Sequence, residues 1–120
     1  MPRHTAVELS SDTLNYLNSR AAIYNGTAND MLRITPTVLQ DSADITAFWR
    51  GHELSHIQSQ EHAPHLADDW DNIIPEDPSA NRSRGANNMT AGEQLSAQLD
   101  NWVDASFIAL DPGLDDSLLP

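Results

Sequence analysis

The stretch Gly51–His62 constrains the fold of this chain more than any other. It holds three of the chain's five histidines. On a helix, His52 and His56 would lie one turn apart on the same face. On a strand they would also share a face, with Glu53 and Ser55 on the other. The spacing fits both structures and leaves open whether the stretch is helix or strand, so the rest of the chain has to decide between two folds.

The length of the chain predicts a single domain, residues 1–120, with one modest core. There is no cysteine, which excludes disulfides and thiol nucleophiles, so a metal ion would need His, Asp, Glu or Asn ligands. No apolar run follows the N-terminus, and no window has the length of a membrane span. We therefore expect no signal peptide and no membrane contact, and a cytoplasmic or virion-associated protein.

The charge of the chain is strongly acidic. Eighteen acids stand against six basic residues, all of them arginine, which gives a formal net charge of −12. A field of this sign repels nucleic acid and anionic membranes, because phosphate binding depends on cationic side chains. Nucleic acid is thus a disfavoured partner. Arg82 and Arg84 are close enough in sequence to form a local positive spot, and they are the candidate phosphate-binding residues.

Two helices are predicted in the first half of the chain. Residues 10–12 offer N-caps for a helix with apolar residues at three-and-four spacing, and Gly26 is placed to end it. Residues 25–30 are predicted to form a loop. Thr35 can then cap a second helix, Pro36–Phe48, with proline at its first position. The pattern admits a break in this helix near Asp41.

The second half of the chain changes character. Residues 58–78 are rich in proline and aspartate, and only Ile73–Ile74 is apolar enough for a short strand. A loop of this length in a compact domain is usually functional. Thr90 and Glu93 then form a capping box that opens a helix. Its apolar positions are Leu95, Leu99, Trp102, Val103 and Phe107, and it is expected to stop at residues 111–113.

These elements predict a mainly α fold with a small β-hairpin, in the α+β class. Residues 1–49 are the helical N-terminal part and residues 50–93 the central motif, followed by a C-terminal helix at 94–111 and an acidic tail at 112–120. The N-terminal arm and the tail, which carries Leu118 and Leu119, are the expected sites of contact with protein partners.

On a helix, residues 52–56 resemble the H-E-x-x-H motif of zinc metallopeptidases. The resemblance implies that His52 and His56 bind zinc and that Glu53 is the general base for a bound water. His62 stands where the metzincin peptidases have their third histidine. Their glycine, which permits the turn toward the metal, is replaced here by Ser59, and positive φ values are uncommon for residues other than glycine.

On a strand, the motif belongs to a longer pattern. Three short elements follow one another in order: residues 55–57, 71–77 and 81–85. Together they resemble the HNH, or His-Me finger, nuclease family in its H-N-N variant, over residues 50–93. The resemblance implies a ββα element in which His56 is the general base for water, Asn72 staples the loop and Asn81 binds a divalent metal.

Phosphodiester hydrolysis explains these residue types. A neutral histidine deprotonates water, and a hard cation such as Mg²⁺ or Mn²⁺ offsets the charge that develops on the phosphate. The family commonly has an acidic or histidine metal ligand directly before its catalytic histidine, and here that residue is Ser55. His52 and Glu53 are therefore further candidate metal ligands.

Three functions follow from these patterns. The first is an HNH-like nuclease fold that cleaves phosphodiesters, or that keeps the fold without the activity. The second is a non-enzymatic structural or assembly subunit, for example of a phage particle, that retains the same fold. The third is a zinc metallopeptidase, with zinc in place of Mg²⁺ or Mn²⁺.

Overall fold

A computed structural model of the chain describes residues 9–110. This part contains five α-helices and two strands: α1 (Ser11–Ala21), α2 (Ala28–Arg33), α3 (Ser42–Arg50), β1 (Glu53–His56), β2 (Ile73–Glu76), α4 (Pro78–Arg84) and α5 (Ala91–Leu110). The predicted mainly helical α+β architecture with one small hairpin is confirmed. The expectations for the N-terminal arm, the end of the last helix and the acidic tail fall on residues outside the described part.

Helix α1 begins where its sequence predicts, but the residue that ends the helical run is Asn25 and not the predicted Gly26. The Ser10 hydroxyl accepts a hydrogen bond from the backbone N–H of Thr13 at 3.3 Å, which satisfies one of the free donors of the first turn. Leu17 and Ala21 are fully buried on the inner face of the helix. After a short 3-10 turn the chain leaves the helical direction at Asn25, which has a left-handed φ of 56°.

Helix α2 corrects the loop predicted at residues 25–30. Thr27 and Asp30 form a capping box, in which the Thr27 backbone N–H donates to the Asp30 carboxylate at 2.9 Å. The helix therefore begins at Ala28, inside the predicted loop. It is short, but it buries Met31 and Leu32 completely or almost completely, and this burial holds it in place.

Helix α3 begins later than predicted. Thr35 does not cap a helix, because its hydroxyl donates to the Met31 carbonyl at 2.7 Å and accepts from the Trp49 indole N–H at 3.0 Å. The N-cap is Asp41, whose carboxylate accepts from the Asp44 backbone N–H at 2.9 Å. A helix over Pro36–Phe48 is thus wrong in its first part, and the admitted break near Asp41 is where α3 starts.

The two strands form an antiparallel pair in which Glu53 lies opposite Glu76 and His56 opposite Ile73. The strand predicted at Ile73–Ile74 is therefore confirmed, and it continues to Glu76. Helix α4 follows at once, capped by Asp77, whose carboxylate accepts from the Ala80 backbone N–H at 3.2 Å. The stretch 53–56 is a strand and not a helix.

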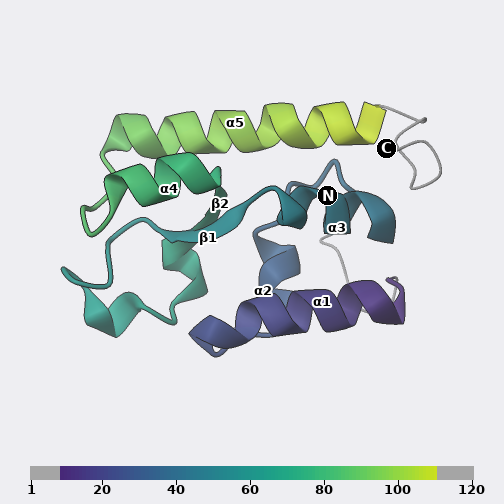
Figure 1. Cartoon of the computed structure of the whole chain (residues 1–120), viewed down its shortest axis with the longest axis horizontal. Helices are drawn as coiled ribbons and strands as arrows, with labels where there is room; N and C mark the ends of the chain where they lie inside the picture. The colour runs from purple at the N-terminus through teal and green to yellow at the C-terminus, as the bar shows by residue number, and fades with distance from the viewer. Residues whose placement is uncertain (1–8, 111–120) are drawn as a thin grey trace.

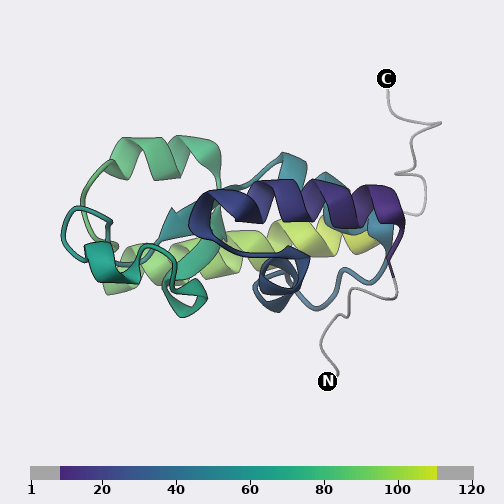
Figure 2. The same cartoon turned by 90° about the horizontal axis from the view of Figure 1, so that it is seen from below.

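The core lies between α5 on one side and α1 on the other (Figure 1), with α3 and the strand pair in the middle. Its largest fully buried side chains are Trp49 and Phe48, both from α3. The long connection between the strands lies at the same end of the molecule as α4 in both views (Figure 2). No helix within residues 9–110 is both long and apolar enough to cross a membrane.

The capping box predicted for α5 is confirmed, since Thr90 and Glu93 each bond the other's backbone N–H, at 2.8 and 3.1 Å. The buried side chains of the helix are small or polar, Ala97, Asn101 and Ala105, and the partly buried Ile108 and Ala109 also pack against the core. The Asn101 amide donates to the Pro75 carbonyl at 2.7 Å, which ties α5 to β2.

Candidate functional site

Asn72 connects the two ends of the long loop between the strands. Its side-chain oxygen accepts from the Gln58 backbone N–H at 2.9 Å, and its amide nitrogen donates to the carbonyls of Gln58 at 3.0 Å and Leu66 at 3.3 Å. The side chain is buried, so these bonds satisfy backbone groups that water does not reach. The Asn72 amide thus fixes the start of the loop at Gln58 and its middle at Leu66.

His56, the last residue of β1, is oriented by this loop. Its Nε2 lies 2.8 Å from the Ala67 carbonyl oxygen. A carbonyl only accepts hydrogen bonds, so Nε2 carries the proton, and in the neutral ring Nδ1 is a free acceptor. The ring packs against Tyr24 in a T-shaped arrangement, with 4.5 Å between the ring centroids. Within residues 9–110 no hydrogen bond engages Nδ1.

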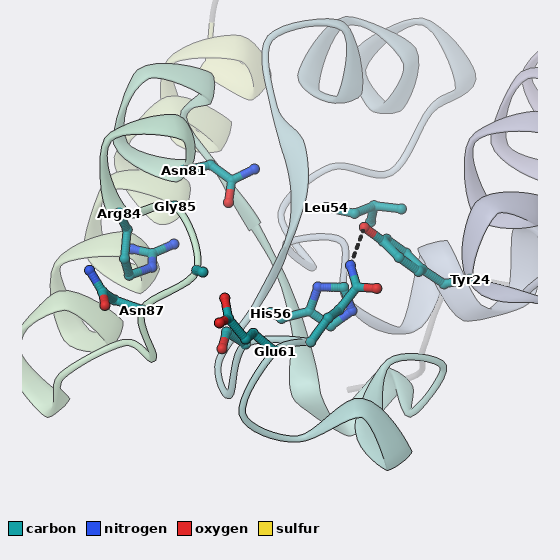
Figure 3. Close-up of a pocket in the computed structure, with 11 residues that line it drawn as sticks. Tyr24, Leu54, His56, Glu61, Asn81, Arg84, Gly85 and Asn87 are labelled. Carbon is teal, nitrogen blue, oxygen red and sulfur yellow. Dashed lines mark hydrogen bonds between the residues drawn. The ribbon is translucent and has the colours of Figure 1, made fainter.

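A cavity of about 400 Å³ opens beside the His56 ring. Figure 3 shows Tyr24 on one side of it, Asn81 and Arg84 on the opposite side, and Glu61 between them. Tyr24 accepts a hydrogen bond from the Gln60 amide at 3.3 Å, and burial raises the pKa of its hydroxyl above the ordinary value. The tyrosine therefore stays neutral at physiological pH.

A buried polar cluster lies on the other face of β1. Arg84 forms a two-pronged ion pair with Glu76, and both side chains are 5% exposed. The hydrogen bond with Glu76 holds the pKa of Arg84 above its ordinary value. The Ser55 hydroxyl accepts from the Arg84 guanidinium at 2.8 Å. Its single proton goes to Glu76 at 2.8 Å or to Asn81 at 2.9 Å.

Glu53 and Ser55 both face α4, as alternation along a strand predicts. The Glu53 carboxylate accepts from the Asn81 amide at 3.1 Å and from the Arg82 guanidinium at 2.8 Å. The Asn81 hydrogen bond is the main cause that lowers the pKa of Glu53 below its ordinary value. The structure therefore brings together two of the three proposed metal ligands, Glu53 and Asn81.

The oxygen atoms at the proposed metal position do not fit a divalent cation. The resemblance places the metal between Ser55 and Asn81, but the permanently charged Arg84 guanidinium already lies 2.8 Å from the Ser55 oxygen. A second cation at that oxygen would be strongly repelled. The nearby carboxylates of Glu53 and Glu76 are both bound by arginine. No group of three or more His, Asp or Glu side chains able to hold a metal occurs within residues 9–110.

His52, the third proposed metal ligand, lies away from this cluster. Its ring stacks on Phe48 with 3.9 Å between centroids, and its two nitrogens bond the Phe48 carbonyl and the Asp104 carboxylate. The zinc-peptidase hypothesis needs a helix that presents His52 and His56 to one metal. Because residues 53–56 form a strand, this arrangement is not present. His62, the third histidine of the metzincin pattern, has its ring bonded to the Ser59 hydroxyl at 2.7 Å.

The two proposed phosphate-binding arginines are both engaged. Arg82 pairs with Glu53 and keeps most of its side chain in solvent. Arg84 is buried and bonded through both terminal nitrogens. A phosphate would have to compete with carboxylates at both positions. Glu76, the partner of Arg84, could not be predicted from the sequence, because two opposite charges eight positions apart give no signal that a strand and a helix will bring them together.

Comparisons of the chain with protein-family models, with curated proteins and with solved structures find no match. The fold and the geometry of the site therefore carry the functional argument.

Proposed function

We propose that residues 53–84 form a ββα element of the His-Me finger type that no longer carries out metal-dependent catalysis, and that the protein acts as a non-enzymatic structural or assembly subunit. The order β1, long loop, β2, α4 supports the first part. So do the loop-bridging amide of Asn72 and the position of His56 at the end of β1.

The position of Arg84 is the main support for the proposal that metal-dependent catalysis has been lost. Its guanidinium is bonded to Ser55 and Glu76 where the resemblance requires a metal ion, and all three side chains are buried. Removing either member of a buried pair of this kind is costly, because the other charge is left without a partner. The cluster is thus a fixed part of the fold, and the Arg84 guanidinium lies where the resemblance would place a metal ion.

A second candidate function is a phosphodiesterase in which His56 still acts as general base. It is favoured by the free Nδ1 of His56 beside a cavity large enough for a nucleotide-sized fragment. Against it stand the net charge of −12 and the engagement of both nearby arginines by carboxylates.

A cleavage assay separates the two functions. Supercoiled DNA and single-stranded RNA are incubated with the protein in Mg²⁺, in Mn²⁺ and in EDTA, with His56→Ala as the matched variant. We expect the wild type and the variant to leave both substrates intact to the same degree. Metal-dependent cleavage by the wild type that disappears in His56→Ala would establish the nuclease and overturn the non-enzymatic proposal.

Metal content gives an independent readout. Elemental analysis of the purified protein and titration with Mn²⁺ are expected to show neither stoichiometric metal nor saturable binding that depends on Asn81, tested with Asn81→Ala. Stoichiometric zinc that is lost when both His52 and His56 become alanine would instead support the peptidase hypothesis.

A further inference from the structure

Helix α5 has two opposite faces, and only one of them meets the core. The inward face is formed by Ala97, Asn101 and Ala105, which recur every fourth residue and are buried. The outward face carries six large apolar side chains that remain 42–79% exposed: Leu95, Leu99, Trp102, Val103, Phe107 and Leu110. We refer to these six residues as the α5 stripe.

The α5 stripe has the pattern of a helix–helix contact. Leu95, Leu99, Val103 and Phe107 form one continuous row at spacing four, the kind of ridge that packs into the grooves of another helix. In Figure 1 α5 forms an edge of the molecule, and no other described helix lies on its outer side. Large contiguous apolar patches are rare on the surface of soluble monomers, and they mark interaction sites.

The charges beside the stripe indicate the kind of partner. Glu93, Asp100 and Asp104 are seven and four residues apart, so they lie along one flank of the stripe. Glu93 already bonds the Thr90 backbone and lies 3.9 Å from Arg84, and Asp104 bonds the His52 ring, so the attraction for a basic partner comes mainly from Asp100 and from the net charge of −12. Helix α5 contains no basic residue, and the whole chain has six arginines against 18 acids. A second copy of this chain would therefore bring acid toward acid, which costs energy at an interface. A basic partner would gain from the same flank.

We propose that the α5 stripe docks an amphipathic helix of a different protein, one whose apolar face is bordered by Lys or Arg. The row of apolar side chains supplies the buried contact, and the acidic surface favours a positively charged partner. The proposal gives the non-enzymatic role its contact surface. The biological meaning of this docking rests on the proposed non-enzymatic function. The docking itself is tested independently, because peptide binding at the stripe is measured separately from cleavage at His56.

The test uses two synthetic helical peptides with the same leucine face, one flanked by lysine and one by glutamate. Their affinity for the full-length protein is measured by fluorescence anisotropy of the labelled peptides, and a change in tryptophan fluorescence that is absent in Trp102→Phe reports contact with the stripe. We expect the lysine peptide to bind at least about tenfold more tightly than the glutamate peptide. Equal affinity of the two peptides would overturn the proposed selectivity.

A variant that keeps every charge separates docking from general attraction between a basic peptide and an acidic protein. Leu99→Ser with Phe107→Ser removes two exposed stripe side chains, and circular dichroism should show an unchanged fold. We expect binding of the lysine peptide to weaken at least about tenfold. Undiminished binding would show that the attraction is purely electrostatic and would refute docking at the stripe.

The same binding experiments can also reveal two other occupants of the α5 stripe. Sedimentation analysis that shows a stable dimer, abolished by Leu99→Ser with Phe107→Ser, would assign the stripe to a second copy. Lysine-peptide binding that appears only after Leu118→Ser and Leu119→Ser would assign it to the chain's own C-terminal residues. Either result would overturn the proposal of a separate basic partner.

Discussion

Arg82 and Arg84 are two positions apart on α4, yet they form ion pairs of different kinds. Arg82 pairs with Glu53 at the surface, and its side chain is 75% exposed. Arg84 pairs with Glu76 in the interior, where both side chains are 5% exposed. Exposed pairs contribute little to stability, whereas breaking a buried pair leaves one charge without a partner.

We therefore expect Arg84→Ala to lower the free energy of unfolding by about 3–5 kcal/mol. Arg82→Ala, the matched surface control, is expected to cost no more than about 1 kcal/mol. Urea unfolding followed by circular dichroism measures both. A loss of the same size for both variants would contradict the distinction drawn between the two pairs.

A double variant shows whether the uncompensated carboxylate causes the loss. Glu76→Met combined with Arg84→Met replaces both charges by apolar side chains of similar length. Because a buried ion pair is often no more stabilising than apolar packing, we expect the double variant to be more stable than Arg84→Ala. A double variant as unstable as Arg84→Ala would point to lost packing around Ser55 instead.

Glu53 predicts a dependence of stability on pH. The Asn81 hydrogen bond, followed by Arg82, holds the pKa of Glu53 in the folded protein below its ordinary value of 4.5. The folded state therefore binds this proton less readily than the unfolded state, and the carboxylate stabilises the fold above about pH 4.5. This contribution is lost as the pH falls through the folded pKa.

The comparison of wild type with Glu53→Gln isolates this effect, because glutamine keeps an oxygen for Asn81 but cannot ionise. We expect the wild type to be the more stable protein at pH 6, and the difference to shrink below about pH 4.5. Urea unfolding of both proteins at pH 6 and pH 3 measures it. A difference that stays constant across this range would contradict the assigned cause.

At the scale of elements, the join between α1 and the long loop depends on one glycine. A Cβ atom at Gly26 would overlap the Trp70 ring, which packs against this turn and donates through its indole N–H to the Tyr24 carbonyl at 3.3 Å. We expect Gly26→Ala to destabilise the protein by about 1–3 kcal/mol, because the rigid indole has to move.

Gly92, in the first turn of α5, is the matched control for that substitution. A Cβ atom there meets nothing closer than the Thr90 hydroxyl at 3.9 Å. Alanine favours a helix over glycine, so Gly92→Ala is expected to stabilise the protein by up to about 1 kcal/mol. Thermal unfolding of the two variants should thus give shifts of opposite sign, and a stabilising Gly26→Ala would contradict the close contact.

The elements that could be predicted from the sequence are those with local end signals. The Ser10 cap, the Thr90–Glu93 box and the Ile73–Ile74 strand depend on neighbouring residues, and the structure has all three. The Thr27–Asp30 box was just as local, but it opens a helix of only six residues that looks like a turn. The helix cap predicted at Thr35 was wrong because the Thr35 hydroxyl accepts a hydrogen bond from the indole of Trp49, which is distant in sequence.

The site could be predicted only in part, for a related reason. A strand puts Glu53 and Ser55 on one face whatever surrounds them, and so their contact with α4 follows from the alternation. Nothing in the order of residues says that Arg84 will turn inward to Glu76 while Arg82 turns outward to Glu53. Likewise, the spacing of the α5 stripe predicts a helix but not whether its apolar face meets the core.

At the scale of the whole molecule, the cavity beside His56 and the α5 stripe are separate surfaces. The residues that line the cavity come from Tyr24, from β1 and the start of the loop after it, and from α4 and the turn after it, and none of them belongs to α5. The inner face of α5 meets β2 through Asn101, and the stripe is on the outer face. A partner bound along the stripe would thus leave the cavity open, so the two sites can be altered and tested independently.

The net charge of −12 predicts how salt affects the stability of the whole fold. Like charges repel more strongly in the compact state, and salt screens this repulsion over a Debye length of about 10 Å at 0.1 M. Salt also weakens the exposed pairs of Arg33 and Arg82, but these contribute at most about 1 kcal/mol each, and the buried Arg84–Glu76 pair is little screened.

Relief of repulsion should therefore prevail, and we expect the melting temperature at pH 7 to rise as NaCl increases from about 10 to 150 mM. The control is the same titration near pH 4, where carboxyl groups are partly protonated and the net charge is small, so the rise should be much smaller. Differential scanning calorimetry measures both series. A melting temperature that falls with salt at pH 7 would mean that the arginine ion pairs outweigh the repulsion among the acids.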